Sequence, residues 1–225
     1  MNDLARRTIL GFVQLILGLG IALFVPGCTL DFWQAWAYLF VFAVSTALIS
    51  AYLWKKDPKL LERRVHAGPG AEKERSQKLI QLFASLAFIG LFILSSLDHR
   101  FVWSKVPLAA VIAGDVLAAL GFLIIFIVFK ENSFTAATIE VTSDQKVVET
   151  GPYAFVRHPM YSGALVMLLG TPLALGSWWG LLMFLPITLV IVWRLLDEEK
   201  FLAEHLPGYP DYRKKVRYRL IPCVW

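Results

Sequence analysis

Six long apolar runs dominate this 225-residue chain and restrict the folds open to it. Hydrophobic residues make up 57% of the sequence, so a soluble domain of this size would expose more contiguous apolar surface than water tolerates. A helix needs about 20 apolar residues to cross a bilayer. The runs span residues 9–25, 35–53, 79–97, 107–129, 161–175 and 178–193. We therefore expect an all-α integral membrane protein with about six transmembrane helices, the last two forming a hairpin around Gly176-Ser177.

Lysine and arginine concentrate in alternate connections between these runs. Residues 55–78 hold eight of them, whereas the connections at 26–34, 98–106 and 176–178 hold few. Cytosolic loops carry the excess of basic residues in membrane proteins. We therefore expect both termini and the 55–78 and 130–160 segments on the cytosolic face. This distribution also accounts for the net charge of +5, so we expect no nucleic-acid partner.

Several other classes of protein are disfavoured by what the sequence lacks. Arg6 and Arg7 precede the first run as in a signal peptide, but no small-residue cleavage site of the usual form follows, so we expect an uncleaved span. Cys28 and Cys223 lie at opposite ends of the chain, which predicts neither a metal site nor a disulfide. The sequence has no phosphate loop and no glycine-rich dinucleotide fingerprint.

Polar side chains gather where the fifth run begins. Residues 151–153 read Gly-Pro-Tyr, which predicts a turn, and residues 157–161 read Arg-His-Pro-Met-Tyr. Pro159 fits the first turn of a helix, whose free N–H groups and positive dipole end favour a carboxylate or phosphate. Ionisable groups at a membrane are costly, which makes this string a candidate site. The plainer alternative is interfacial anchoring by snorkelling side chains.

A second charged cluster follows the sixth run and includes Arg194, Asp197, Glu198 and Glu199. Arg194 and Glu198 are one helical turn apart. The simpler interpretation is an exposed intrahelical ion pair, which stabilises a helix by about 0.3–0.5 kcal/mol. The hairpin, however, returns this cluster beside Arg157 and His158. There the acids and arginines could enclose a zwitterionic or cationic ligand.

The C-terminal half resembles a known family. It contains, in order, Gly-Pro-Tyr-x3-Arg-His-Pro-x-Tyr-x-Gly, an apolar hairpin, an Arg before Glu-Glu, Tyr-x2-Tyr and Arg-x-Ile-Pro. This combination is similar to the isoprenylcysteine carboxyl methyltransferases and the related phospholipid N-methyltransferases. The resemblance covers roughly residues 130–222. It divides the chain into a four-span region, 1–130, and a methyltransferase core, 131–225, with a cytosolic C-terminal cap.

The resemblance implies S-adenosylmethionine as cofactor and a lipophilic acceptor that arrives from the bilayer lipids. It implies cofactor contacts from Gln145, Lys146, Val147, Val148, Tyr153, His158, Pro159, Tyr161 and Glu198. It implies that Arg194 faces an acceptor carboxylate, and we expect Arg157 and Glu199 in catalytic roles. Residues 206–209, Leu-Pro-Gly-Tyr, differ from the usual family pattern, so we expect a reshaped end to the preceding helix.

The favoured reading is carboxyl O-methylation of an isoprenylcysteine-like acceptor. A carboxylate is already a nucleophile, so alignment matters more than acid–base help. Phospholipid N-methylation is an alternative, with His158 or Glu199 as the base for an amine. An NADPH-dependent sterol or polyprenyl reductase is a second alternative, because residues 218–222 resemble the ending of such enzymes. A non-catalytic lipid-binding protein is a third. The sequence leaves the oligomeric state open.

Overall fold

The computed structural model describes residues 3–65, 70, 75–135, 137–138, 141 and 145–225. All regular secondary structure in these segments is helical, in agreement with the all-α prediction. The α-helices are α1 Asp3–Gly27, α2 Trp33–Lys56, α3 Pro58–Val65, α4 Arg75–Phe101, α5 Leu108–Glu131, α6 Pro159–Ala174, α7 Phe184–His205 and α8 Tyr209–Lys215, with 3₁₀ turns η1 Gly151–Ala154 and η2 Trp179–Met183.

Each of the six predicted apolar runs coincides with a helix. Five helical segments of the described chain are long and apolar enough to cross a membrane: α1, α2, α4, α5 and the continuous stretch from η2 through α7. The sixth, α6, has 16 residues. At 1.5 Å per residue it extends about 24 Å, which is shorter than the hydrocarbon core. The sequence also predicts a short extended segment at residues 138–141, which lies partly outside the described residues.

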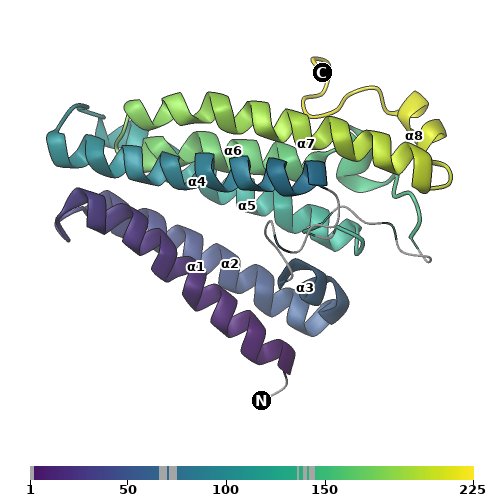
Figure 1. Cartoon of the computed structure of the whole chain (residues 1–225), viewed down its shortest axis with the longest axis horizontal. Helices are drawn as coiled ribbons and strands as arrows, with labels where there is room; N and C mark the ends of the chain where they lie inside the picture. Colours follow the sequence, from purple (N-terminus) through teal and green to yellow (C-terminus); the bar gives the residue numbers. More distant parts are fainter. Residues whose placement is uncertain (1–2, 66–69, 71–74, 136, 139–140, 142–144) are drawn as a thin grey trace.

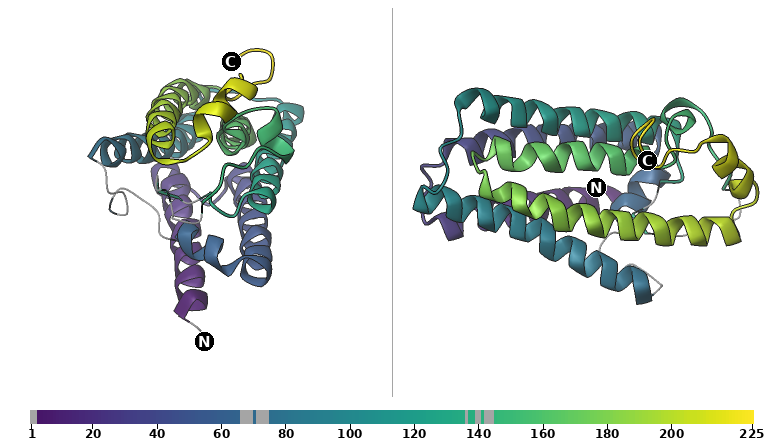
Figure 2. Two further views of the ribbon diagram at one scale, coloured as in Figure 1. Left: turned by 90° about the vertical axis from the view of Figure 1, so that its right-hand side faces the viewer. Right: turned by 90° about the horizontal axis from the view of Figure 1, so that it is seen from above.

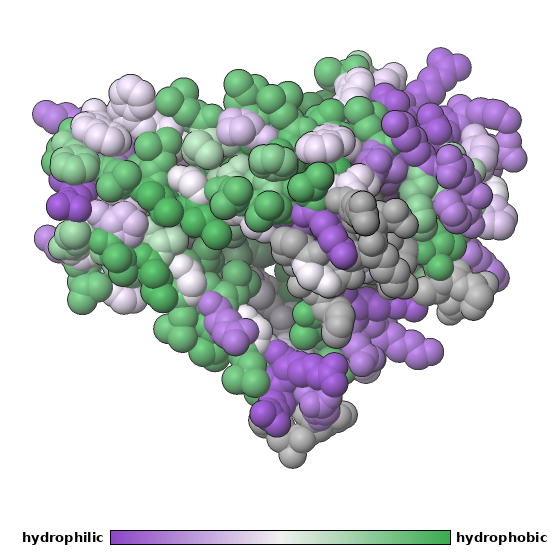
Figure 3. All heavy atoms as spheres, in the orientation of Figure 1, coloured by the Kyte–Doolittle hydropathy of each residue, from purple (hydrophilic) through white to green (hydrophobic). Residues whose placement is uncertain are grey.

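The long helices lie roughly side by side, with two distinct ends (Figures 1 and 2). The connections α1–α2, α4–α5 and α6–η2 lie at one end, and α3, η1, α8 and the C-terminal tail lie at the other. Hydrophilic residues gather at this second end, whereas hydrophobic ones cover the length of the helices (Figure 3). The chain therefore has one strongly polar end, as the distribution of lysine and arginine predicts.

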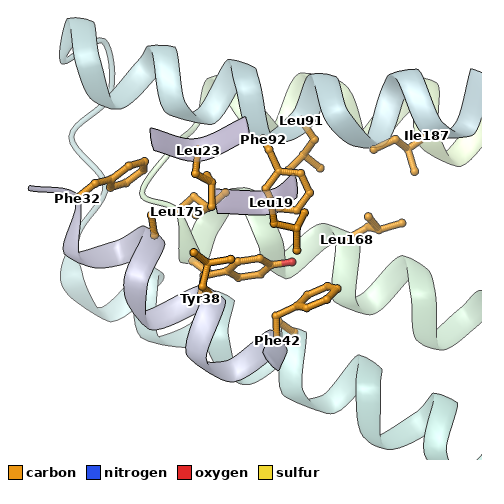
Figure 4. Close-up of a cluster of buried hydrophobic side chains, with 14 of the residues drawn as sticks. Leu19, Leu23, Phe32, Tyr38, Phe42, Leu91, Phe92, Leu168, Leu175 and Ile187 are labelled. Atoms are coloured by element: carbon orange, nitrogen blue, oxygen red, sulfur yellow. The ribbon is translucent and has the colours of Figure 1, made fainter. Parts of the chain in front are cut away.

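The apolar core draws side chains from α1, α2, α4, α5, α6 and α7 (Figure 4). Leu23, Tyr38 and Phe92 are fully buried there. The hydroxyl of Tyr38 forms a hydrogen bond with Thr171 Oγ1 at 3.0 Å, and this bond joins α2 to α6. Such pairing is needed because an unsatisfied polar group in an apolar interior is costly.

A buried aspartate organises the less polar end. Asp98 was expected in a loop, but α4 extends past it to Phe101. Its carboxylate accepts bonds from Ser104 N and Oγ, both at 2.7 Å, and from the hydroxyl of Ser177. Asp98 thereby fixes both the α4–α5 connection and the turn after α6, which explains why a charged residue is tolerated there.

Glycines bring α5 and α6 into backbone contact. A Cβ atom at Gly114 would lie 2.2 Å from Ala174 N and 2.7 Å from Gly170 O, and one at Gly121 would lie 2.6 Å from Gly163 O. Small residues at helix crossings are typical of membrane proteins, where packing rather than the hydrophobic effect drives association. The two glycine pairs therefore hold the short α6 against the longer α5. In the predicted hairpin, α6 packs most closely on α5 rather than on α7.

We expect Gly114→Ala to lower the midpoint of thermal unfolding in detergent. The added methyl group would overlap the α6 backbone, which cannot move as a flexible side chain could, at a cost of about 1–3 kcal/mol. Gly18→Ala in α1 is the matched control, because nothing lies within 4 Å of the added atom. Its midpoint should stay unchanged or rise, since alanine favours helix. Equal midpoints for both variants would contradict the proposed α5–α6 contact.

Candidate functional site

A cavity of about 580 Å³ opens among α3, α4, α5, α6 and α7 at the polar end of the molecule. Its size lies within the range of about 300–1,000 Å³ that is usual for small-molecule sites. One part of its wall is polar and aromatic, formed by residues 145–148, Glu198, Tyr153 and Tyr209. The other part is largely apolar and lies between the membrane-spanning helices. The cavity thus suits a ligand pair of contrasting polarity.

The start of α6 is fastened to the C-terminal tail. The N–H of Arg157 donates to Tyr218 O at 2.9 Å, and that of His158 donates to Arg219 O at 3.0 Å. Ser162 Oγ donates to Leu220 O at 2.7 Å. His158 and Pro159 occupy the N-cap and first positions of α6, as the sequence predicts. The tail therefore determines where this wall of the cavity lies.

Glu199 is the buried ionic centre behind that wall. Its carboxylate lies 2.6 Å from Arg157 Nε, 3.2 Å from His158 Nε2 and 3.2 Å from Arg219 Nε. It is 3% exposed and does not line the cavity. Three cationic or basic groups already occupy its oxygens. This placement argues against the catalytic role expected for Glu199 and gives it a structural one, joining α7, the start of α6 and the tail.

The adjacent Glu198 points into the cavity and belongs to a different network. The hydroxyl of Tyr161 donates to Glu198 Oε2 at 2.7 Å and accepts from Arg194 Nε at 3.1 Å. Arg194 also donates to Gln77 Oε1 at 3.1 Å and to Ala137 O at 2.9 Å. Tyr161 thus bridges the acid and the arginine, so these contacts differ from the simple exposed Arg194–Glu198 pair that was the plainer alternative.

Three tyrosines form the aromatic wall. The hydroxyl of Tyr153 accepts a hydrogen bond from Asn132 Nδ2 at 3.0 Å. The main-chain oxygen of Tyr153 accepts one from the Tyr212 hydroxyl at 2.8 Å. Burial raises the pKa of both Tyr153 and Tyr209, so these phenols stay neutral. Tyr209 is 4% exposed, and its buried hydroxyl has no hydrogen-bond partner among the residues that the structure describes. Because most buried polar groups are hydrogen-bonded, this hydroxyl is available to a polar group that enters the cavity.

Gly208 explains how Tyr209 reaches this wall. It caps α8 with φ at +85°, a left-handed conformation that glycine adopts without steric cost. The expectation that this helix end differs from the usual family pattern stays a prediction. The turn redirects the chain after α7, so that both Tyr209 and Tyr212 are buried against Tyr153.

Arg64 is a cavity residue that the sequence did not reveal. It lies in α3, its guanidinium carbon is 4.9 Å from the centroid of the Phe129 ring, and Nη1 is 3.6 Å from Met160 Sδ. Burial lowers its pKa to about 10, an effect to which the charge of Arg194 contributes. At neutral pH the residue remains a cation. In the sequence it is one of eight basic residues in a polar segment, and nothing there distinguishes it from its neighbours.

The structure brings together most of the residues predicted for the site. The predicted residues that line the cavity are Gln145, Lys146, Val147, Val148, Tyr153, Arg157, His158, Pro159, Tyr161, Arg194 and Glu198. Glu199 is the exception. Cavity residues that sequence reasoning missed include Arg64, Gln81, Asn132 and Tyr209. Tyr209 belongs to the Tyr-x2-Tyr pattern of the resemblance, whereas Arg64, Gln81 and Asn132 are identified by their tertiary placement.

Comparison with known proteins finds similarity over a segment that contributes much of the cavity lining. Residues 109–207 match the family model described as phospholipid methyltransferase. A protein-S-isoprenylcysteine O-methyltransferase of Schizosaccharomyces pombe is 37% identical over 79 residues, which are 32% of this chain and 32% of that protein. The Delta(14)-sterol reductase TM7SF2 of Mus musculus is 32% identical over 95 residues, 39% of this chain and 22% of that protein. The matched segments thus span at most about a third of these relatives.

We expect Glu199→Gln to destabilise the fold strongly. Removing the buried carboxylate leaves Arg157 and Arg219 without their shared anion, and breaking a buried pair in this way costs about 3–5 kcal/mol. The measurement is the midpoint of thermal unfolding in detergent. Glu204→Gln on the exposed surface of the same helix is the control and should shift the midpoint little. A Glu199→Gln protein as stable as this control would show that Glu199 is not a structural centre.

Proposed function

We propose that the protein transfers the methyl group of S-adenosylmethionine to a lipophilic membrane acceptor, because residues 109–207 match the family model described as phospholipid methyltransferase. Carboxyl O-methylation of an isoprenylcysteine-like acceptor is the reaction we favour. The observation that carries the proposal is a single cavity with an acidic, aromatic part beside an apolar part that holds two arginines.

The polar part of the cavity has the groups that S-adenosylmethionine requires. When bound, this cofactor supplies an electrophilic methyl group on a positively charged sulfonium. The Glu198 carboxylate offers the opposite charge, and the faces of Tyr153 and Tyr209 favour a cation or an adenine ring. The unpaired Tyr209 hydroxyl offers a hydrogen bond. Residues 145–148 and His158 would complete this binding surface.

The apolar part has the features of an acceptor site. Ile125, Met167 and Ile191 line it from α5, α6 and α7, at the depth of the membrane-spanning helices. Arg64 and Arg194 lie on the same cavity. Two cations on the cavity wall favour an anionic group on the acceptor and disfavour an ammonium group. A lipid tail among the helices with its carboxylate at the arginines fits these walls.

The residues of the cavity would act mainly by positioning. Arg64 and Arg194 would hold the acceptor anion, and the apolar walls would exclude water around it. Tyr161, bonded to both Glu198 and Arg194, would fix the distance between the cofactor-binding acid and the acceptor-binding arginine. A carboxylate acceptor needs no base, so alignment of the two reactants would supply the rate enhancement. Arg157, on the wall itself, and Glu199, behind it, would support this geometry.

The contacts around the cavity support phospholipid N-methylation and NADPH-dependent reduction less well. N-methylation of a phospholipid amine needs a base, and Glu199, one candidate, is held by Arg157 and Arg219 outside the cavity. His158 Nε2 is directed to the same carboxylate. An NADPH-dependent reductase is the second candidate, because of the similarity to the mouse sterol reductase. It would place a phosphate-rich cofactor near Glu198, which repels such a group.

The basic loops favour a cavity that opens to the cytosol.

We expect Glu198→Gln to weaken binding of S-adenosylmethionine by about tenfold to a hundredfold. The variant loses one charge-assisted contact of about 1.5–3 kcal/mol. Titration calorimetry on the purified full chain measures the dissociation constant. Glu204→Gln, on the same helix but outside the cavity, should bind as the wild type does. If the wild type binds NADPH and not S-adenosylmethionine, the reductase reading replaces ours.

We expect Arg64→Gln to raise the KM for a carboxylate acceptor, with N-acetyl-S-farnesylcysteine as the probe, by about tenfold. Loss of one ionic hydrogen bond of about 1.5 kcal/mol accounts for the change. Affinity for S-adenosylmethionine should not change. Arg63→Gln is the matched control, because the Arg63 side chain donates to Ser133 O and does not line the cavity. A loss of cofactor affinity without a change in KM would place Arg64 on the cofactor side.

A further inference from the structure

A second hollow lies behind the cavity wall and is almost wholly basic. Its lining consists of Arg157, Pro210, Arg213, Lys214, Arg217 and Arg219, so five of six residues are cations. It is formed by α8 and the tail, at the polar end of the molecule (Figure 1). The proposed methyl transfer makes no use of this hollow. Such a concentration of positive charge beside membrane-spanning helices requires its own explanation.

The carboxylates around the hollow do not balance these cations. Among the described residues, the carboxylates within salt-bridge distance of the five are Glu199 and Asp211. Glu199 is shared by Arg157 and Arg219 and lies 4.0 Å from Arg213 Nη2. Asp211 pairs with Lys214 at 2.8 Å. The guanidinium of Arg217 is exposed and has no partner within the described part of the chain. The hollow therefore keeps a net positive charge.

The surroundings of the hollow resemble a membrane interface more than open solvent. The tail that forms one side carries exposed apolar side chains, Ile221, Val224 and Trp225. The guanidinium carbon of Arg219 lies 4.9 Å from the centroid of the Trp225 ring. Indole rings concentrate at the headgroup level of bilayers, and basic clusters beside a membrane-spanning helix attract anionic lipids. Exposed apolar side chains and cations that outnumber their carboxylate partners thus occur on one small surface.

We infer that the hollow lined by Arg157, Arg213, Arg217 and Arg219 binds the phosphate of an anionic phospholipid headgroup, with the apolar tail residues against the acyl chains. Arginine suits this ligand because its planar fork donates two parallel bonds to phosphate oxygens. The site is separate from the acceptor cavity, although Arg157 takes part in the wall between them. It is independent of which methyl acceptor the enzyme uses.

The test is native mass spectrometry of the full chain in detergent, titrated with dioleoylphosphatidylglycerol or dioleoylphosphatidylcholine. We expect the anionic lipid to bind the wild type more tightly than the zwitterionic one. Arg213→Gln/Arg217→Gln should weaken binding of the anionic lipid by at least about tenfold. Arg217→Gln alone should weaken it in the same direction, and it removes no bond within the described protein, so loss of folding would not explain its effect.

Lys55→Gln/Lys56→Gln is the matched control, because it removes two exposed charges from the end of α2, away from the hollow. Binding to this variant should stay within about twofold of the wild type. Unchanged binding in the Arg213/Arg217 variant would overturn the inference, as would an equal loss in the Lys55/Lys56 control. Complete displacement of the lipid by inorganic phosphate would identify a free phosphate as the ligand and would also overturn it.

Discussion

The arrangement of this molecule depends on one buried carboxylate. Glu199 holds Arg157, His158 and Arg219 at the level where the helices meet the polar end. Burying ions is costly, and the cost is offset only when each charge has close partners and further hydrogen bonds. Arg157 meets this condition, since its Nη1 also donates to the main-chain oxygens of Val216 and Arg217. Through these bonds α7, the start of α6 and the tail form one unit, and two hollows of different character lie on either side of it.

Helix packing places the unit correctly. The glycines of α5 and α6 allow the backbones to touch, so α6 is held although it is shorter than the membrane-spanning helices beside it. Its polar N-terminal end consequently lies beside Glu198 and Glu199 of α7. Tyr161, one turn into α6, then reaches Glu198 and Arg194 on α7. A chain of contacts thus connects glycines in the membrane region to the geometry of the cavity.

The sequence predicted the parts of this structure that follow from local pattern. Apolar length identified the helices, and the 151–163 string identified the start of α6, because both are recognisable without tertiary contacts. It placed both Glu198 and Glu199 in the site. Neighbouring residues on a helix point about 100° apart, so one enters the cavity and the other lies behind its wall, and only packing decides which. Arg64 was missed for a similar reason, since its role depends on α3 folding across to Phe129 and Met160.

The proposed reaction is tested most directly by methyl transfer itself. Membranes containing the full chain would be incubated with S-adenosylmethionine labelled in its methyl group, together with N-acetyl-S-farnesylcysteine, and the lipid-soluble product would be treated with base. A carboxyl methyl ester releases labelled methanol in base, whereas an N-methyl group does not. Our account predicts a labelled product that releases methanol and is absent from membranes lacking the protein. A base-stable product, or no transfer to any lipophilic acceptor, would contradict it.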